Sequence, residues 1–222
     1  MALEMDDPSV LETRFWLLRH PEPEAFAQGR CYGSLDVGLS PRGVRQADEV
    51  AGALAVEPFA AIYTSPSRRC AEAAAKIAAG RTCPLEIMDE LRELHFGEFE
   101  GRTYDEIPAL YPEIYRQWME RPTDVRFPGG ERFVDMVERV MTAETNLRLR
   151  HAGESIALVT HAGAIRIILG NALGMDLANI FRIGQEYSAV NLVRYFGSNP
   201  VVGLMNADAS LGWRRDRDSN PG

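Results

Sequence analysis

Short, continuous apolar runs recur along the chain and are separated by longer stretches of mixed polarity. Such runs are typical of strands that are buried on both faces. They predict strands over Arg14–Arg19, Ala60–Thr64, Leu85–Met88 and Ser155–Thr160. A closing pair of strands is predicted over Ala189–Phe196 and Val201–Asn206, because the turn residues 198–200 lie between them.

The stretches between these runs predict helices. Ser40-Pro41 and Ser65-Pro66 each offer a Ser as N-cap and a Pro at the first helical position, so helices are expected to begin there and to run to about Leu54 and Ala79. Three more are predicted over 103–121, with a break near Pro108 and Pro112, over 131–150 and over 162–173.

Strands that alternate with helices predict an α/β fold with a largely parallel sheet. In such sheets ligands bind outside the carboxyl ends of the strands. The loops after Arg19, Thr64 and Thr160 should therefore meet at one edge. Each carries basic residues, which are Arg19-His20, Arg68-Arg69 and His161.

Composition narrows the range of partners and compartments. The 222 residues suffice for one domain, expected over 13–207, with a flexible extension over 1–12 and a flexible tail over 208–222. The net charge of −8 repels nucleic acid and anionic membrane surfaces, so neither is an expected partner. Residues 1–12 are acidic and unlike a signal peptide, no run is long enough for a membrane span, and the three cysteines fit no disulfide or zinc pattern. We therefore expect a cytoplasmic protein.

A histidine beside an arginine at a strand end suits phosphoryl transfer to nitrogen. Guanidinium forks on Arg19 and Arg69 match the oxygens of a phosphate monoester. His20 fits the nucleophile, because Pro21 holds its backbone extended. The leaving alkoxide needs a proton, and a carboxylic acid held protonated at Glu93 is the best candidate to supply it.

Four segments carry a resemblance to a known family. LLRH at 17–20 is similar to a signature that ends in R-H-G, and TSPSRR at 64–69 to an S-S-P-x-x-R segment. ELHFGEFEG at 93–101 resembles E-x-x-F-G-x-x-E-G, and VTHAG at 159–163 resembles a second-histidine motif. From Arg14 to about Phe196, the chain thus resembles the histidine phosphatase superfamily, also called the phosphoglycerate mutase-like family.

The resemblance implies a three-layer α/β/α sandwich with a mostly parallel central sheet. It also implies a metal-independent phosphomonoesterase without a cofactor, which forms a phosphohistidine intermediate on His20. In that scheme Arg19, Arg69 and His161 form the phosphate pocket, and Glu93 is the general acid. The motif selects Arg69 rather than Arg68. Tyr32 and Gly33 are expected at the mouth of the substrate site.

Departures from the family pattern narrow the subfamily. Pro21 stands where the family usually has glycine, and the segments 20–23 and 29–36 are similar to bacterial α-ribazole phosphatases. Gly38 replaces a frequent proline, and Arg132 replaces a serine near the expected substrate entrance. The expected partner is a small phosphorylated metabolite, such as α-ribazole phosphate. A homodimer is left open.

Other functions are weighed against this one. A phosphoglycerate mutase would favour a long closing insertion, and Glu93–Arg121 is compact. A binding module for phosphorylated ligands would not need both histidines and both arginines. No G-x-G-x-x-G follows a strand, which disfavours a dinucleotide site. His95, His151 and Arg68 are expected to lie on the surface or behind the site, and Cys31 to have a packing role.

Overall fold

Six strands form one mixed sheet in the computed structural model, which describes residues 11–211. The strands are β1 (Glu12–Arg19), β2 (Phe59–Thr64), β3 (Leu85–Ile87), β4 (Ser155–Thr160), β5 (Val190–Phe196) and β6 (Asn199–Ala207). Their order is β3-β2-β4-β1-β5-β6. The first four in this order are parallel, and β5 is antiparallel to both β1 and β6. The predicted mostly parallel sheet is confirmed.

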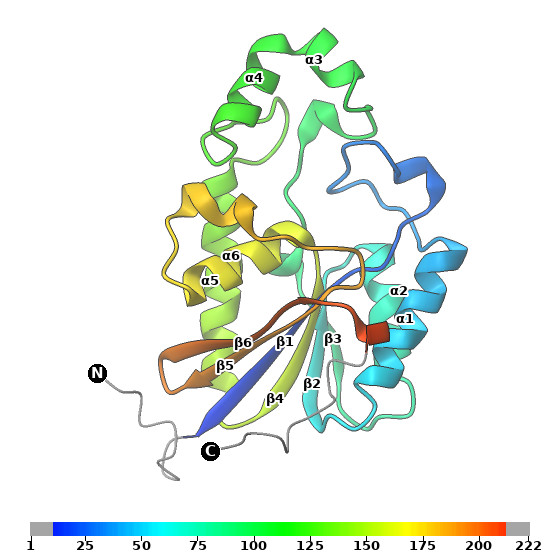
Figure 1. Ribbon diagram of the computed structural model, residues 1–222, viewed down its shortest axis with the longest axis vertical. Coiled ribbons are helices and arrows are strands. Elements are labelled where there is room, and N and C mark those ends of the chain that lie inside the picture. The colour runs from blue at the N-terminus through cyan, green and yellow to red at the C-terminus, as the bar shows by residue number, and fades with distance from the viewer. Residues whose placement is uncertain (1–10, 212–222) are drawn as a thin grey trace.

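Helices cover both faces of the sheet (Figure 1). The helices α1 (Pro41–Ala53) and α2 (Arg68–Ala78) lie on one face, and α5 (Phe133–Arg150) and α6 (Ala162–Ala172) lie on the other. The short helices α3 (Glu106–Leu110) and α4 (Pro112–Glu120) stand beyond the sheet at one end of the molecule. The predicted break between them lies at Tyr111. This arrangement confirms the three-layer α/β/α sandwich.

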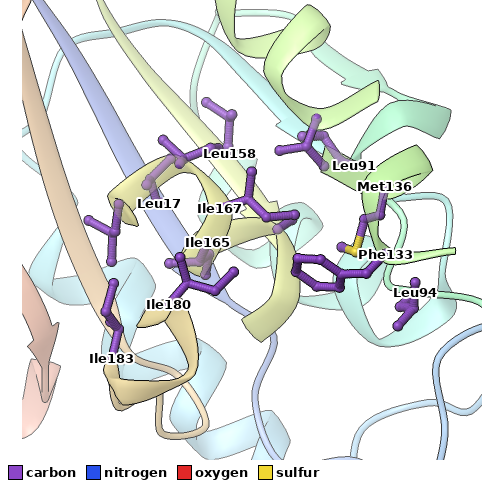
Figure 2. Packing of buried hydrophobic residues seen from close by; sticks show 14 of the residues in the cluster. Leu17, Leu91, Leu94, Phe133, Met136, Leu158, Ile165, Ile167, Ile180 and Ile183 are labelled. Atoms are coloured by element: carbon purple, nitrogen blue, oxygen red, sulfur yellow. The ribbon is translucent and has the colours of Figure 1, made fainter. Parts of the chain in front are cut away.

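Alternate residues of each central strand feed two separate cores. Phe15 and Leu17 of β1 belong to the core under α5 and α6, which Figure 2 shows from close by. Trp16 and Leu18 belong to the core under α1 and α2. Because both faces of the strand are covered, its sequence is continuously apolar rather than alternating.

The first turn of α2 differs from the prediction. Ser40 caps α1 as predicted, since its hydroxyl accepts from the Gly43 N–H at 2.9 Å. Ser65 does not cap α2, which begins at Arg68 instead. The Asp36 carboxylate accepts the Arg68 N–H at 2.7 Å and supplies the missing acceptor. The Ser65 hydroxyl is bonded to His161 at 2.8 Å instead.

The ordered domain is slightly longer than the sequence predicted. Glu12 already belongs to β1, where its carboxylate pairs with Arg14 at 2.7 Å and with Arg194 at 2.6 Å. Ala209–Leu211 form a 3-10 helix, and Ala209 packs against the core under α1. The described elements therefore extend slightly beyond the expected boundaries at 13 and 207. The rest of the predicted extension and tail, 1–10 and 212–222, lies outside the described residues.

The strand ends meet as predicted. Arg19 is paired with Thr160 in the sheet register, and Thr64 with Val159. The ladder continues one residue further on each side, because His20 N–H donates to Thr160 O at 2.9 Å and Ser65 N–H donates to Val159 O at 3.0 Å. The backbone hydrogen bonds of the sheet therefore fix the positions of His20 and His161 at the strand ends.

Candidate active site

The carboxyl ends of β1, β2 and β4 bring the predicted basic residues together. The rings of His20 and His161 have centroids 5.1 Å apart. Together with Arg19 and Arg69 they line a cavity of about 220 Å³. Arg68 points away, toward the carboxylates of Glu72 and Glu24.

His20 is held in one orientation by the backbone next to it. Its side chain is buried, with 2% exposed. Nδ1 lies 2.8 Å from the carbonyl oxygen of Pro21, so the hydrogen-bond pattern assigns the ring proton to Nδ1. The lone pair of a neutral ring is then on Nε2. This is the state that a nitrogen nucleophile requires.

His161 has a partner at each ring nitrogen. Nε2 lies 2.8 Å from the Ser65 hydroxyl, and Nδ1 lies 3.3 Å from an Nη atom of Arg69. A hydroxyl can donate or accept, so Ser65 is compatible with either tautomer of the ring. Arg69 can only donate, so its contact assigns the lone pair to Nδ1 and the ring proton to Nε2, which donates to the Ser65 hydroxyl.

The two arginines are anchored by main-chain carbonyl groups. Arg19 donates from Nη1 to Gln185 O. Arg69 donates from Nη1 to Leu35 O at 2.9 Å and from Nη2 to Gly33 O at 2.7 Å. The complete guanidinium fork that the sequence predicted for Arg69 is therefore already engaged.

Each of the two guanidinium groups has a buried donor without a partner in the described part of the chain. Among residues 11–211, the Nε atoms of Arg19 and Arg69 are buried and have no hydrogen-bond partner. A buried donor without a partner destabilises a protein by about 1–3 kcal/mol. Both arginines line the same cavity, and two guanidinium charges there indicate a site for an anion.

Burial and the arginines keep both histidines neutral. Burial, then Arg69 and then Arg19, lowers the pKa of His20 well below 6.5. Burial and Arg69 likewise lower the pKa of His161 well below 6.5. The charged imidazolium is disfavoured because it would lose its hydration and would face two guanidinium groups.

These pKa shifts predict a loss of stability at mildly acidic pH. Below 6.5 the unfolded chain binds two protons that the folded chain does not bind, so the free energy of unfolding should fall as the pH drops toward the lowered values. Between about pH 7.5 and about pH 5.5 we expect a loss of roughly 1 kcal/mol per histidine. Urea unfolding at the two pH values measures it.

The variant His20→Gln serves as the control for this prediction, because it should remove about half of the pH dependence. Glu12 does not interfere, because its two arginines lower its pKa from 4.5 to about 2 and its contribution is lost only at lower pH. An unchanged free energy of unfolding across the same pH range would contradict the assignment of neutral buried histidines.

Glu93 lies at the N-terminus of α6. One carboxylate oxygen accepts the Gly163 N–H at 3.0 Å, and the other accepts the Leu94 N–H at 2.9 Å. A side chain at residue 163 would not fit, because a Cβ there would lie 2.2 Å from Glu93 Oε1. Both carboxylate oxygens of Glu93 thus accept from backbone N–H groups, one of them in the first turn of α6. Glu93 lines the same cavity as His20.

A second, outer cavity of about 560 Å³ shares Glu93 and His161 with the inner one. The inner cavity has aromatic walls, which are Tyr32, Phe96, Tyr104 and Tyr187. The residues that line the outer cavity include Gly33, Ser34, Arg92, His95 and Glu131. Tyr32 and Gly33 thus line different cavities. A Cβ at Gly33 would lie 1.9 Å from Leu94 O, so only glycine fits there.

Glu100 supports the pocket, and sequence reasoning missed it. Its carboxylate accepts the N–H groups of Gly33, Ser34 and Leu35 at 2.9, 2.9 and 3.2 Å. The carbonyl groups of Gly33 and Leu35 are the acceptors that hold Arg69. The signal was present in the sequence, because Glu100 is the second glutamate of the 93–101 motif.

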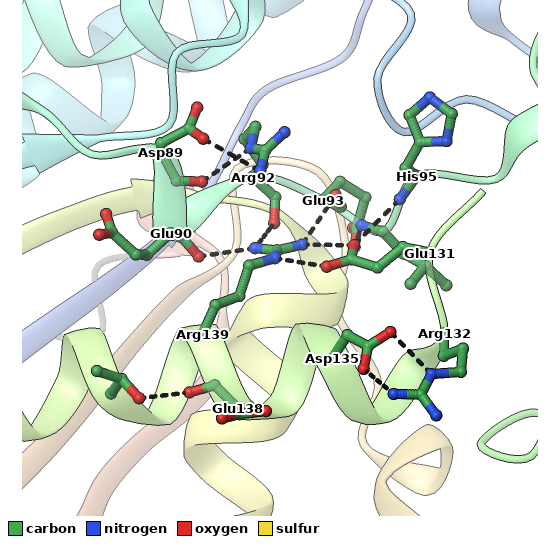
Figure 3. A network of polar contacts seen from close by, with 12 residues as sticks. Asp89, Glu90, Arg92, Glu93, His95, Glu131, Arg132, Asp135, Glu138 and Arg139 are labelled. Atoms are coloured by element: carbon green, nitrogen blue, oxygen red, sulfur yellow. Dashed lines mark hydrogen bonds and ion pairs between the residues drawn. The ribbon is translucent and has the colours of Figure 1, made fainter. Parts of the chain in front are cut away.

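Arg139 of α5 fastens the segment that carries Glu93. It donates to the carbonyl oxygens of Glu90, Arg92 and Glu93 at 2.7, 2.7 and 3.1 Å. It also pairs with the Glu131 carboxylate at 2.8 Å. Figure 3 shows this guanidinium between the 90–93 backbone and Glu131. The sequence contained no signal for this residue.

The other predicted residues lie around the site or away from it. Arg132 pairs with Asp135 and lines neither cavity itself, although Glu131 next to it lines the outer cavity. His95 does line the outer cavity. His151 is buried away from both cavities, between Tyr63 and Glu154. Cys31 is buried in a hydrophobic core, and burial raises the pKa of its thiol.

Two further properties concern the described part of the chain. Between residues 11 and 211, no three His, Cys, Asp or Glu residues are grouped in a way that could hold a metal ion. In the same range, no helix combines the length and the apolar character needed to cross a membrane.

Comparison with known proteins adds to this geometry. Residues 15–208 match the family model of the histidine phosphatase superfamily, branch 1. The match spans nearly all of the described chain and includes every residue that lines the inner cavity.

Individual relatives cover almost the same range. Phosphoserine phosphatase 1 of Hydrogenobacter thermophilus is 31% identical over 88% of this chain and 93% of its own. Adenosylcobalamin/α-ribazole phosphatase of Salmonella typhimurium is 28% identical over 85% of this chain and 95% of its own. The solved structure of Bacillus stearothermophilus YhfR superimposes with a TM-score of 0.82 at 29% identity, over 86% of this chain and 96% of that one. The chain belongs to the histidine phosphatase superfamily and is a phosphatase.

Proposed function

We propose that the enzyme hydrolyses small phosphate monoesters in two steps, through a phosphohistidine on Nε2 of His20. The observation that carries this proposal is the combination of a neutral His20, held by the Pro21 carbonyl at 2.8 Å, with two buried Nε donors that have no partner among the described residues. A nucleophile and the ligands of an anion thus share one cavity.

In the first step, the Nε2 lone pair of His20 attacks phosphorus. The N–P bond forms as the bond from phosphorus to the ester oxygen breaks, and the ester oxygen takes a proton from Glu93. The guanidinium groups of Arg19 and Arg69 stabilise the charge on the transferred phosphoryl oxygens. The Pro21 carbonyl stabilises the positive charge that develops on the His20 ring.

In the second step, water attacks the phosphohistidine. Glu93, now a carboxylate, accepts a proton from that water, and the N–P bond breaks to return neutral His20 and inorganic phosphate. The two hydrogen bonds that Glu93 accepts from the backbone suit this second role. For the first role Glu93 must carry a proton when the substrate is bound.

The substrate is proposed to be a small phosphorylated metabolite, and α-ribazole phosphate is the first candidate. The aromatic walls of the inner cavity, including Phe96 and Tyr104, suit a flat base. Phosphoserine is the second candidate, because the relative from Hydrogenobacter is a phosphoserine phosphatase and the charged residues Arg92 and Glu131 line the outer cavity. Release of phosphate from the two compounds, compared at equal concentration, distinguishes them.

The same assay tests the two alternative functions. A mutase-type phosphotransferase would move phosphate between hydroxyl groups of its substrate and release little of it. A binding module would retain the substrate unchanged. The segment between Glu93 and Arg121 contains a 3-10 turn at Gly97–Phe99 and the short helices α3 and α4, and this compact segment favours release over retention.

Chelators should leave the activity unchanged. The proposed anion ligands are guanidinium groups, so hydrolysis of nitrophenyl phosphate after treatment with EDTA should stay within about twofold of the untreated rate. The control is an assay with added magnesium or zinc, which should not raise the rate. Activity that disappears with EDTA and returns with either ion would overturn the metal-independent mechanism.

A further inference from the structure

Two tyrosines from distant parts of the chain meet beside His20. Tyr32 belongs to the loop before α1, and Tyr187 to the loop before β5. Their hydroxyl oxygens lie 2.9 Å apart, within hydrogen-bond distance. The ring centroids of Tyr32 and Tyr187 are 6.2 and 5.8 Å from that of His20. The proposed mechanism assigns no role to this pair.

Each tyrosine ring lies against one of the two phosphate-pocket arginines. The guanidinium carbon of Arg69 is 5.0 Å from the centre of the Tyr32 ring. The guanidinium carbon of Arg19 is 4.3 Å from the centre of the Tyr187 ring. A cation over an aromatic face is attracted to it, so each ring restrains the guanidinium group that it covers.

The loops that carry the tyrosines also hold the arginines by their carbonyl groups. Gly33 O, next to Tyr32, accepts from Arg69. Gln185 O, two residues before Tyr187, accepts from Arg19. The hydroxyl contact between the tyrosines therefore connects the loop that holds one arginine to the loop that holds the other.

The backbone beside Tyr187 is strained, which indicates that its position is enforced. Ser188 has a φ of 63°, a left-handed conformation that is uncommon for residues other than glycine. Such strain persists only where the surrounding structure determines the conformation, and it clusters at functional sites. The strained turn places the Tyr187 ring between His20 and Arg19.

We propose that Tyr32 and Tyr187 form a brace that sets the spacing of Arg19 and Arg69 for the bound phosphoryl group. Both are positioning residues that act through the arginines. The proposal rests on the proposed function, because the arginines are taken as the phosphate ligands. It predicts that the hydroxyl contact matters for the affinity of phosphate itself, whatever the alcohol of the ester is.

A double-mutant cycle tests the brace. Tyr32→Phe, Tyr187→Phe and the double variant keep both rings and remove the hydroxyl contact. The measurements are the inhibition constant of inorganic phosphate and kcat/KM for nitrophenyl phosphate. Each single variant should weaken phosphate inhibition by about fivefold, the usual worth of one hydrogen bond. The double variant should be no weaker than either single variant, because all three lose the same bond.

The matched control is Tyr111→Phe, which removes a hydroxyl bonded to Glu98 at 2.7 Å outside the two cavities. It should leave phosphate inhibition unchanged. Thermal unfolding of every variant separates a loss of fold from a loss of position. Unchanged inhibition in the single variants, multiplied effects in the double variant, or an equal effect of Tyr111→Phe would overturn the brace. Failure of the proposed function would instead appear in the wild type, as an absence of phosphate inhibition.

Discussion

Replacing His20 by alanine is expected to lower kcat/KM for nitrophenyl phosphate by about 10⁴-fold or more while the fold is retained. Loss of a catalytic nucleophile elsewhere has effects of up to about 10⁶-fold. The reason here is geometric, because the proposed mechanism places the transferred phosphoryl group on Nε2 of this residue, whose other nitrogen is held by Pro21. Steady-state kinetics measures the loss, and circular dichroism checks the fold.

The matched control for this prediction is another buried histidine. His151→Gln changes a ring that is bonded to Tyr63 and Glu154 and lines neither cavity, so its turnover should stay near that of the wild type. If His20→Ala kept a tenth or more of the wild-type kcat/KM, the covalent route through His20 would be wrong. Direct attack of water on the ester would then become the better mechanism.

The second large effect concerns Glu93, and it depends on the leaving group. Glu93→Gln should slow an alkyl phosphate by about 10²–10⁴-fold, the usual contribution of a general acid. It should slow nitrophenyl phosphate much less, because nitrophenolate leaves without a proton. The comparison of kcat/KM for the two substrates measures the effect, provided that phosphorylation of His20 limits the rate.

The two substrates act as each other's control. Equal losses on both would show that Glu93 positions the pocket through its bonds to Leu94 and Gly163 rather than donating a proton. Glu22 and Glu131 would then be the next acids to examine. Each already has a cationic partner, Arg42 for Glu22 and Arg139 for Glu131, so neither is as free to donate as Glu93.

The fold could be predicted from the sequence to a large extent because strand burial leaves a strong pattern. Arg14–Arg19 and Ser155–Thr160 are apolar runs whose two faces are both covered, and they became neighbouring parallel strands. Parallel strands end at the same edge, so the meeting of His20 and His161 followed from the predicted topology. The prediction of Glu93 rests on its place after a predicted strand and among apolar residues, and the family resemblance supports that choice.

What the sequence could not provide are contacts between distant loops. The bond between Tyr32 and Tyr187 joins residues 155 positions apart. Asp36 caps α2 from across the site, so the local Ser-Pro pattern at 65–66 gave the wrong helix start. No local sequence pattern shows whether a helix is capped by a residue next to it or by a carboxylate from a distant loop.

The hydrogen-bond state of Glu93 also required the structure. Its neighbours in sequence, Leu91 and Leu94, are buried and apolar, which favoured a desolvated acid. One carboxylate oxygen accepts the Gly163 N–H in the first turn of α6, 70 residues away in the chain. A side chain can thus have surroundings that differ from those of its own segment. The burial of its neighbours in sequence does not predict its hydrogen bonds.

Trapping the phosphoenzyme tests the central claim most directly. Rapid quenching with a ³²P-labelled monoester, followed by peptide mapping, should find label on His20 that is stable in base and lost in acid. The label should be on Nε2, because Nδ1 donates to the Pro21 carbonyl at 2.8 Å. Label that survives acid and is lost in base, label on another residue, or turnover without any labelled enzyme would contradict the account.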